Sequence, residues 1–236
     1  MRDKRVTICA CASRSFIDKN KVGEIAEAMK SEGYLVTIIP DLCRMIMQSS
    51  AGLSEIASHT ICACYPRAVH ALFQTQDIVP EKIVDIRNSS IQEICSQLNI
   101  IVEEQNRSGN DLFMDEIGAF PVETGRDAWY PVIDKDKCSE CEKCHDFCLF
   151  GVYSNEGGRV RVTQPQNCKN NCPACARICP SKAIIFPKYE KSPINGGLQD
   201  EEQALALDTK KVYADALRMR LEQRRASVSL LKRDNK

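Results

Sequence analysis

The 236-residue chain lacks any excess of charge, because 32 Lys and Arg residues are balanced by 32 Asp and Glu residues. A neutral molecule has no overall field that would attract it to nucleic acid or to an anionic membrane. No apolar run approaches the roughly 18 residues that a membrane span needs, and the N-terminal residues M-R-D-K-R-V-T-I-C contain no secretory apolar segment. These features predict a cytoplasmic protein that binds no nucleic acid and has no membrane span.

Two kinds of site also lack their usual residues. The fingerprint G-x-G-x-x-G does not occur in the sequence, so no flavin or nucleotide is expected in this chain. Only three histidines are present, and none belongs to a recognisable nucleophile–base pattern. The sequence therefore gives no support for a hydrolase.

Cysteine, by contrast, is abundant, with 14 residues. A reducing compartment does not normally maintain structural disulfides, so this number indicates metal or redox chemistry. Eight cysteines lie between Cys138 and Cys179, five lie between Cys9 and Cys64, and Cys95 stands alone. This grouping is the main clue, because a metal site needs several ligands close together.

The first hundred residues alternate β-like runs with amphipathic helical runs. We expect strands at residues 5–12, 35–40, 59–66 and 82–86. Helical runs follow them; one spans residues 21–30 and is closed by Gly33, and another is capped by Ser89 or Ser90. Strands that alternate with helices predict a small open parallel sheet with right-handed crossovers. Residues 1–105 are therefore interpreted as an α/β domain.

The rest of the chain divides into three parts. Residues 106–129 are rich in glycine and acidic residues and are interpreted as a linker. Residues 130–190 form a cysteine-rich α+β module with an internal repeat. Residues 191–236 are expected to be a C-terminal helix and a basic tail; the helix is interpreted as packing on its own chain rather than on a partner.

The cysteine-rich module contains two similar runs. The first, C-S-E-C-E-K-C-H-D-F-C from Cys138 to Cys148, has the C-x2-C-x2-C-x3-C spacing of a [4Fe–4S] site. The second, C-K-N-N-C-P-A-C-A-R-I-C-P, runs from Cys168 to Pro180 and is one residue longer near its start. Soft thiolate sulfurs suit the iron of such a cluster. A pair of zinc sites is the alternative, and iron–sulfur is favoured because each run holds four cysteines.

These runs resemble the bacterial-type dicluster ferredoxin domain over residues 130–187. Two features depart from that family: Leu149 replaces a proline that often follows the fourth cysteine, and Asn170 and Asn171 lengthen the second run. The resemblance implies two [4Fe–4S] clusters, with the fourth cysteine of each run reaching across to the other cluster. His145 is expected to be a surface residue rather than a ligand. The implied ligand sets are Cys138, Cys141, Cys144 and Cys179 for one cluster, and Cys168, Cys172, Cys175 and Cys148 for the other.

The sequence T-I-C-A-C occurs twice among the predicted strands, at Thr7 to Cys11 and at Thr60 to Cys64. The carboxyl ends of parallel strands line one crevice, so five cysteines should crowd one edge of the sheet. Residues i and i+2 on a strand share a face, so each C-A-C pair is expected to aim both sulfurs together. The five cysteines are Cys9, Cys11, Cys43, Cys62 and Cys64.

This crowding predicts a third metal site, with an iron–sulfur cluster favoured ahead of zinc. A reactive dithiol and simple hydrophobic packing are the alternatives, and packing is the interpretation preferred for Cys95. Arg14 and Arg67 lie near this edge; they either stabilise an anionic cluster, contact a partner carboxylate or are ordinary surface residues.

The motifs I-C-A-C, D-L-C and C-A-C-Y-P-R also resemble, in the same order, the N-terminal domain of the heterodisulfide reductase A subunit. The resemblance covers residues 5–73 and implies that the domain holds an iron–sulfur cluster. Cys62 would be a spare or substitute ligand. The implied ligands are Cys9, Cys11, Cys43 and Cys64.

Two functions are therefore predicted for the chain. In the first, it is an iron–sulfur electron-transfer protein or subunit, with two [4Fe–4S] clusters and a third metal site, serving a larger redox complex through a redox partner protein. In the second, the N-terminal cysteines reduce a disulfide or a small acceptor, because five thiols leave one more than a four-ligand site needs. An electron-transfer component of an oxidoreductase is favoured over a stand-alone enzyme.

Overall fold

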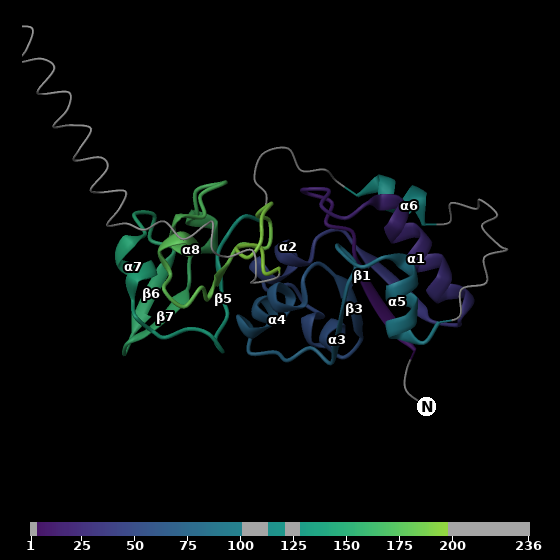
Figure 1. Ribbon diagram of the computed structural model, residues 1–236, viewed down its shortest axis with the longest axis horizontal. Helices are drawn as coiled ribbons and strands as arrows, with labels where there is room; N and C mark the ends of the chain where they lie inside the picture. Colours follow the sequence, from purple (N-terminus) through teal and green to yellow (C-terminus); the bar gives the residue numbers. More distant parts are fainter. Residues whose placement is uncertain (1–3, 101–112, 121–127, 198–236) are drawn as a thin grey trace, which may run out of the picture. The chain divides into compact units, whose positions relative to one another are not determined.

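A four-stranded parallel sheet organises the N-terminal part of the chain (Figure 1). The computed structural model describes residues 4–100, 113–120 and 128–197. All four strands expected from the sequence are present and parallel, which confirms the predicted α/β architecture. In spatial order they are β2 (Leu35–Ile39), β1 (Arg5–Cys9), β3 (Thr60–Ala63) and β4 (Lys82–Asp85).

The strand order creates a switch point between β1 and β3. Strand β1 pairs with β2 from Arg5 opposite Leu35 onward, and the chain then crosses to β3 on the other side of β1. Where two successive connections leave a parallel sheet in opposite directions, a crevice opens beyond the carboxyl ends of the two central strands. The two T-I-C-A-C segments form these two strands, so Cys9, Cys11 and Cys64 lie at their carboxyl ends, beside that crevice.

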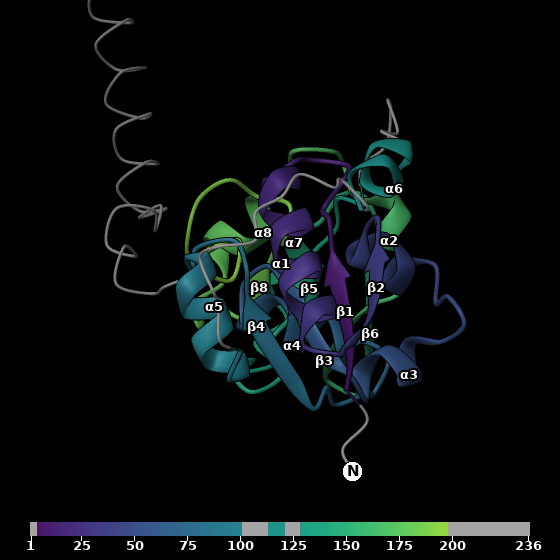
Figure 2. The ribbon, with the colours of Figure 1, turned by 90° about the vertical axis from the view of Figure 1, so that its right-hand side faces the viewer.

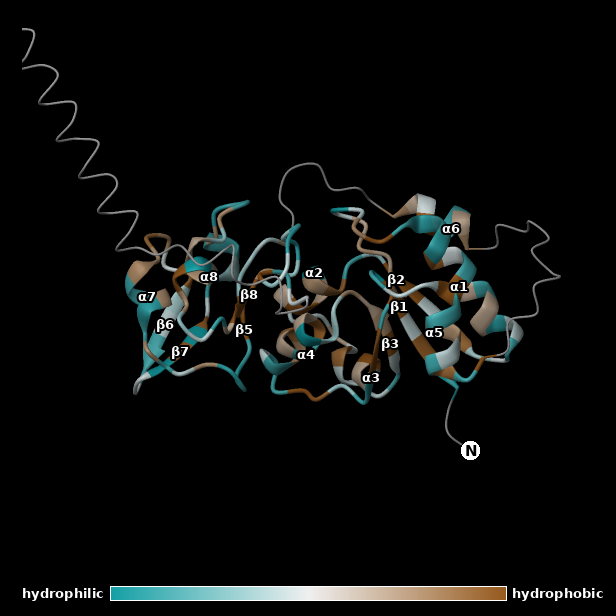
Figure 3. Ribbon diagram, in the orientation of Figure 1, coloured by the Kyte–Doolittle hydropathy of each residue, from teal (hydrophilic) through white to brown (hydrophobic). Residues whose placement is uncertain are grey.

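Helices cover both faces of the sheet. Alternate residues of each strand enter different cores; Ile61 packs on one face and Cys62 on the other, as the period of two requires. Figure 3 shows the hydrophobic strands inside these helical layers. One face, toward the viewer in Figure 2, carries α1 (Lys19–Ser31), α5 (Ile91–Leu98) and α6 (Met114–Ala119); the other carries α2 (Leu42–Met47), α3 (Leu53–Ala57) and α4 (Pro66–Gln74).

Local sequence signals set where the longer helices begin. The side chain of Asp18 accepts a hydrogen bond from the Asn20 N–H at the start of α1. Helix α5 begins with a capping box, in which Ser90 accepts from the Glu93 N–H while the Glu93 carboxylate accepts from the Ser90 N–H. The sequence offered both Ser89 and Ser90 as candidate caps for this helix, and the structure shows that Ser90 is the cap.

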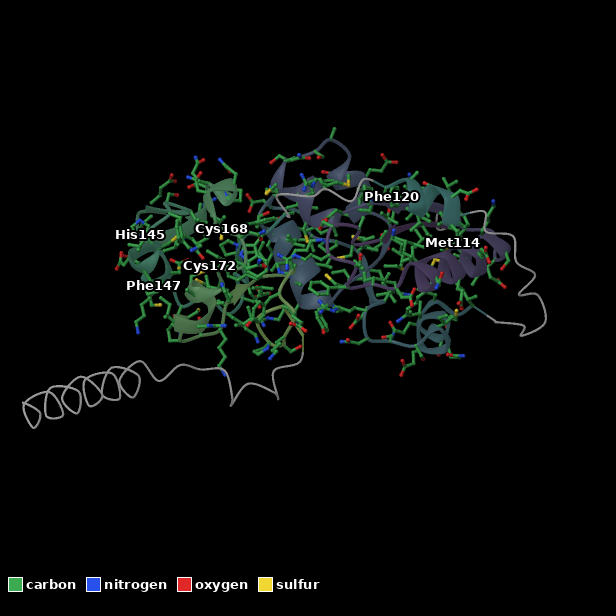
Figure 4. The ribbon with its side chains drawn as sticks, turned by 90° about the horizontal axis from the view of Figure 1, so that it is seen from above. Met114, Phe120, His145, Phe147, Cys168 and Cys172 are labelled. Carbon is green, nitrogen blue, oxygen red and sulfur yellow. The ribbon has the colours of Figure 1, made fainter. Side chains whose placement is uncertain are left out.

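The predicted linker contains a helix that the sequence did not reveal. Helix α6 buries Ile117 against the core beneath α1, and Met114 lies so close to Gly23 that a Cβ there would approach its sulfur to 3.1 Å. Figure 4 labels Met114 and Phe120 at the two ends of this helix. A six-residue helix spans too few turns to display a periodic pattern, which explains why it was missed. Residues 101–112 and 121–127 of the linker region lie outside the described residues.

The cysteine-rich part, residues 128–197, combines antiparallel strands with short helices. Each cysteine run contains one of these helices, since α7 carries Cys144 and α8 carries Cys175. Trp129, Tyr153 and Phe186 belong to its buried core. Its elements are β5 (Val132–Ile133) paired with β8 (Ile184–Ile185), the hairpin of β6 (Tyr153–Glu156) and β7 (Arg159–Val162), α7 (Lys143–Phe147), the 3-10 helix η1 (Pro165–Asn167) and α8 (Ala174–Ile178).

The chain divides into two compact units, Met1–Glu201 and Glu202–Lys236, and all described residues belong to the first. The sheet region (residues 4–100) and the cysteine module (residues 128–197) are thus parts of one unit. The expected C-terminal helix and basic tail lie outside the described residues from 198 onward, and residues 191–197 form turns. Within the described ranges, the helices are too short or too polar to traverse a bilayer.

A closing turn at the end of the cysteine module packs against α4. The Phe186 N–H donates to the Ile194 carbonyl over 2.7 Å, and Asn195 is completely buried. Gly196 has φ +92°, and a Cβ built on it would lie 2.7 Å from the Cβ of Ala68. Only glycine satisfies both the left-handed backbone and the close approach at this position.

Replacing Gly196 tests this contact. Gly196→Ala should destabilise the protein by about 2 kcal/mol or more, because backbone strain and a clash with Ala68 act together. The measurement is urea unfolding of protein purified without oxygen. The control is Gly118→Ala in α6, where open space surrounds the new methyl group; it should leave stability within about 1 kcal/mol. Equal effects of the two substitutions would contradict the close packing.

Candidate metal centres

Four sulfurs surround one hollow in the cysteine module. Glu140 and Glu142 adopt left-handed backbone conformations (φ +50° and +59°), which turn the loop so that successive cysteines of the first run face inward. The Cys179 thiol comes from the second run and interacts electrostatically with Cys138 and Cys144. The first four-cysteine group, which lines this hollow, is Cys138, Cys141, Cys144 and Cys179.

The other sulfurs of the module are also brought together. Cys148, from the first run, interacts electrostatically with Cys168 and Cys175. The Tyr153 hydroxyl donates a hydrogen bond to the Cys175 Sγ over 3.1 Å. Cys168 and Cys172 interact as well, and Figure 4 labels them in the same part of the module. The second four-cysteine group is therefore Cys168, Cys172, Cys175 and Cys148. In both groups the structure places the fourth cysteine of one run beside the first three of the other.

These groups suit a cationic metal core. Burial raises the pKa of Cys144 to about 11 and that of Cys168 and of Cys175 to about 12, so thiolates here need a compensating positive charge. Four soft sulfur donors around a hollow fit a [4Fe–4S] cluster in number and in chemistry.

The other donors considered in the sequence have less support. His145 does not line the hollow; its Nδ1 lies 3.0 Å from the Asp146 carboxylate, and Figure 4 shows it at the outer margin of the module. In residues 4–100, 113–120 and 128–197, no three His, Cys, Asp or Glu side chains are grouped as a single metal ion would require.

The sheet region holds a third gathering of sulfurs. Its centre is Lys188, whose Nζ donates to the Cys11 Sγ over 3.3 Å and to the Asp41 carboxylate over 2.7 Å. Cys9, which also accepts from the Leu42 N–H, interacts electrostatically with this lysine. The N-terminal cysteine group, whose members all interact with Lys188, is Cys9, Cys11, Cys43 and Cys64. Four of the five cysteines expected at this edge of the sheet are thus brought together.

The expectation that each C-A-C pair aims both sulfurs together holds for Cys9 and Cys11, which interact with each other and with Lys188, but it is wrong for Cys62 and Cys64. Strand β1 ends at Cys9, and Cys11 lies beyond it with φ +49°, so the two residues belong to different cores. Cys62 lies within β3, is completely buried and joins the same core as Cys95. Its neighbour in the motif, Cys64, packs against the opposite core. The sulfurs of the first pair thus meet beyond the end of β1, whereas the end of β3 at Ala63 separates Cys62 from Cys64.

Charge compensation is built into the N-terminal cysteine group. Burial raises the pKa of Cys64 to about 12 and raises the pKa of Cys9 and of Cys43 as well. Burial alone would lower the pKa of Lys188, but Cys43, Cys11 and Asp41 together hold it well above its usual range. Lys188 therefore remains a cation beside the thiols. It lies just after β8, far from these cysteines in sequence, and no sequence signal pointed to it.

Further hydrogen bonds connect the sheet region with the cysteine module. Arg67 donates to the Asp134 carboxylate over 2.8 Å and to the Lys182 carbonyl over 2.5 Å. Arg14 donates to Asn171 over 2.6 Å, and the Tyr130 hydroxyl donates to the Cys43 carbonyl over 2.7 Å. Both arginines that the sequence placed near the cysteine edge thus make contacts within the chain itself.

Comparison with known proteins identifies the class. No family model matches the chain. It is 41% identical over 112 residues to an uncharacterized ferredoxin of Methanocaldococcus jannaschii, a match that covers 45% of this chain and 76% of that protein. It is 36% identical over 62 residues to pyruvate synthase subunit PorD of the same organism, covering 26% of this chain and 70% of PorD. Ferredoxin-3 of a Nostoc species is 33% identical over 88 residues, covering 28% of this chain and 90% of that relative.

These relatives agree with the chemistry of the cysteine groups. Ferredoxins carry electrons on iron–sulfur clusters held by cysteine thiolates. The chain belongs to the ferredoxin family. Its sheet region adds to the cysteine module a second cysteine-bearing structure, connected to it through Lys188 and the two arginines.

Removing the buried lysine tests how far this connection stabilises the fold. The side chains of Lys188 and Asp41 are 2% and 5% exposed, so Lys188→Met would leave a buried carboxylate without its cation. We expect a loss of about 3–5 kcal/mol, measured by urea unfolding of oxygen-free protein. Lys191→Met is the matched control, because Lys191 is exposed and its loss should cost less than about 0.5 kcal/mol. A Lys188 variant as stable as this control would show that the ion pair does not hold the two regions together.

Proposed function

We propose that this ferredoxin transfers single electrons for a larger redox complex, using two [4Fe–4S] clusters in the cysteine module and a third in the sheet region. The observation that carries the proposal is the exchange of the fourth cysteines between the two runs. Cys179 lies with the first run and Cys148 with the second, which is the arrangement used by two-cluster ferredoxins. The first and second four-cysteine groups are the proposed ligand sets.

The N-terminal cysteine group is the proposed site of the third cluster. Its four thiols come from the ends of β1 and β3 and from the start of α2, at the switch point of the sheet. Four soft donors that are buried together need cations to stabilise their charge, and Lys188 supplies only one. Cys62 is excluded from the proposed ligand set because it interacts with Lys82 and Cys95, and not with Lys188 or the other four thiols.

Hydrogen bonds from the protein to the cysteine sulfurs would adjust the reduction potentials of these clusters. When bound, each cluster supplies a centre that accepts or releases one electron. The Tyr153 hydroxyl, the Ala183 N–H and the Leu42 N–H each donate a hydrogen bond to one of the cysteine sulfurs, Cys175, Cys179 and Cys9 respectively. Such donors stabilise negative charge on sulfur and therefore favour the reduced state. Cys9, Cys11 and Cys43 are buried, whereas Cys141 is exposed and the other cysteines of the module, apart from the buried Cys175, are partly exposed.

The relatives support a partner that is a larger redox enzyme. Two of them, from Methanocaldococcus jannaschii and Thermotoga maritima, are named as the PorD subunit of pyruvate synthase. A ferredoxin subunit of this kind serves another polypeptide, and we propose the same relation for this chain with a donor and an acceptor of its own.

No observation in the described residues favours the alternative of a disulfide reductase. That alternative depended on one thiol being left over at the edge of the sheet. Cys62 is the leftover residue, but its exposed fraction is zero and burial raises its pKa to about 12. A neutral thiol that solvent does not reach cannot attack a disulfide.

Metal analysis tests the number of clusters. Protein purified without oxygen should contain about twelve iron atoms and about twelve acid-labile sulfides per chain. Cys43→Ser should lower both to about eight, whereas the matched variant Cys62→Ser should leave them unchanged. About eight irons in the wild type would exclude the third cluster. A reconstituted preparation that holds zinc and no iron would overturn the proposal as a whole.

Paired substitutions test the exchanged fourth cysteines. If Cys138 and Cys179 hold the same cluster, the double variant Cys138→Ser/Cys179→Ser should lose only one cluster and retain about eight irons. If Cys168 and Cys179 hold different clusters, Cys168→Ser/Cys179→Ser should retain about four. The opposite pattern would mean that each run holds its own cluster. Iron counting with low-temperature EPR of the reduced protein distinguishes the two arrangements.

A further inference from the structure

The second cysteine run is longer than the first at one place, and this place contacts the sheet region. The first two cysteines of the first run are separated by two residues, whereas Cys168 and Cys172 are separated by Lys169, Asn170 and Asn171. Asn171 has φ +61°, a left-handed conformation that asparagine tolerates better than most residues. The additional length thus forms an exposed turn between two cysteines of the second four-cysteine group.

Arg14 holds this turn from the side of the sheet. Its guanidinium donates to the Asn171 Oδ1 over 2.6 Å and to the Asn170 Oδ1 over 3.2 Å. The same guanidinium lies 5.1 Å from the centre of the Trp129 ring, which belongs to the core of the cysteine module. A planar guanidinium can bind two amide oxygens and an aromatic face at once, which an ammonium group cannot do.

Arg14 also belongs to the loop that carries the N-terminal cysteine group. It follows Cys11 by three residues, and its N–H donates to the Cys11 carbonyl over 3.2 Å. Asp41, which forms the ion pair with Lys188, accepts a hydrogen bond from the hydroxyl of Ser13, the residue before Arg14. One short loop therefore contacts both the N-terminal cysteine group and the turn of the second run.

The packing of Cys168, on the cysteine-module side of the junction, also brings the two cysteine groups close together. Cys168 packs against two cores, the one that contains Cys9 and Cys43 and the one that contains Cys175. The second four-cysteine group is consequently the neighbour of the N-terminal cysteine group. In Figure 4, Cys168 lies on the sheet side of His145, which marks the helix of the first run.

We propose that Arg14 is a positioning residue, which clasps the Asn170–Asn171 turn and so fixes the second four-cysteine group beside the N-terminal cysteine group. The inference rests on the proposed function for the identity of the bound groups, but the clasp itself is a contact between residues of the chain. The asparagine pair that departs from the ferredoxin pattern is then the part of the second run adapted to the sheet region.

Two readouts on the oxygen-free, metal-loaded protein test the clasp. The first is hydrogen exchange of the Cys172 amide, which donates to the Lys169 carbonyl over 3.1 Å across the turn; Arg14→Ala should accelerate it about tenfold because it removes the hydrogen bonds that hold the turn. The second is EPR of the fully reduced protein, in which magnetic interaction between neighbouring centres broadens the signals. Arg14→Ala should weaken that interaction without a change in iron content.

The matched control is Arg177→Ala. Arg177 is an exposed arginine of the second run itself, and it donates to the Tyr189 hydroxyl over 3.2 Å within the cysteine module. It should change neither readout. Arg14→Lys should restore little, since an ammonium lacks the planar fork. Shortening the turn by deleting Asn170 should reproduce the effect of Arg14→Ala on the EPR interaction.

The outcomes separate the clasp from the proposed function. Unchanged exchange in Arg14→Ala, or equal acceleration in Arg177→Ala, overturns the clasp even when the iron count is about twelve. A wild-type count of about eight irons, with the exchange effect present, overturns the third cluster and leaves the clasp standing. With about twelve irons and the exchange effect, unchanged EPR interaction would overturn the positioning role of Arg14.

Discussion

The cost of burying sulfur anions is the constraint on which this structure depends. Burial raises the pKa of cysteines in all three groups, so the same chain would keep neutral thiols there unless positive charge were supplied. In the cysteine module, the clusters proposed for its sulfurs would supply this positive charge. The sheet region adds a charged side chain of its own, Lys188, at the centre of the group. We therefore expect metal binding and folding to be coupled in this protein.

The junction between the two regions combines a shared apolar core with specific polar contacts, because Tyr130, Val132 and Ile185 of the cysteine module belong to the same buried cluster as residues of α2, α3 and α4. Arg67 and Asp134 form an ion pair with little exposed surface, and the Tyr130 hydroxyl binds a backbone carbonyl of the sheet region. Removing one partner of such a pair costs more than the pair itself contributes, because the other is left buried and unpaired. These contacts favour one relative orientation, which matters for a protein whose electron-carrying sites must lie at fixed separations.

Much of the architecture could be predicted from local patterns. The four strands, the two longer helices of one face and the cap at Ser90 follow from periodicity and capping chemistry, which act over a few residues. Parallel strands also imply a common carboxyl edge, and this placed Cys9, Cys43 and Cys64 near one another. The error about the second C-A-C pair arose where β3 ends at Ala63, because the regular alternation of side chains ends there and Cys64 lies beyond it.

Other features depended on contacts between residues far apart in sequence. In the segment F-P-K-Y-E, nothing distinguishes Lys188 from an ordinary surface lysine. Its contact with Asp41 forms only in the folded structure. Arg14 and Arg67 were noticed for their nearness to cysteines, but their partners lie in the module that was treated as separate. Helix α6 was missed because six residues carry no periodic signal. Sequence periodicity predicts each helix or strand separately, whereas these features arise from contacts between distant parts of the chain.

The position of Lys188 determines whether either region of the chain could be exchanged on its own. A gene fusion that merely joined two self-sufficient parts would leave each with a complete interior, so that either could be cut away or exchanged for a homologue. Here one half supplies the cation that the other half buries. The sheet region therefore depends on a side chain of the cysteine module. Joining the sheet region to a different ferredoxin would require an equivalent lysine in that ferredoxin.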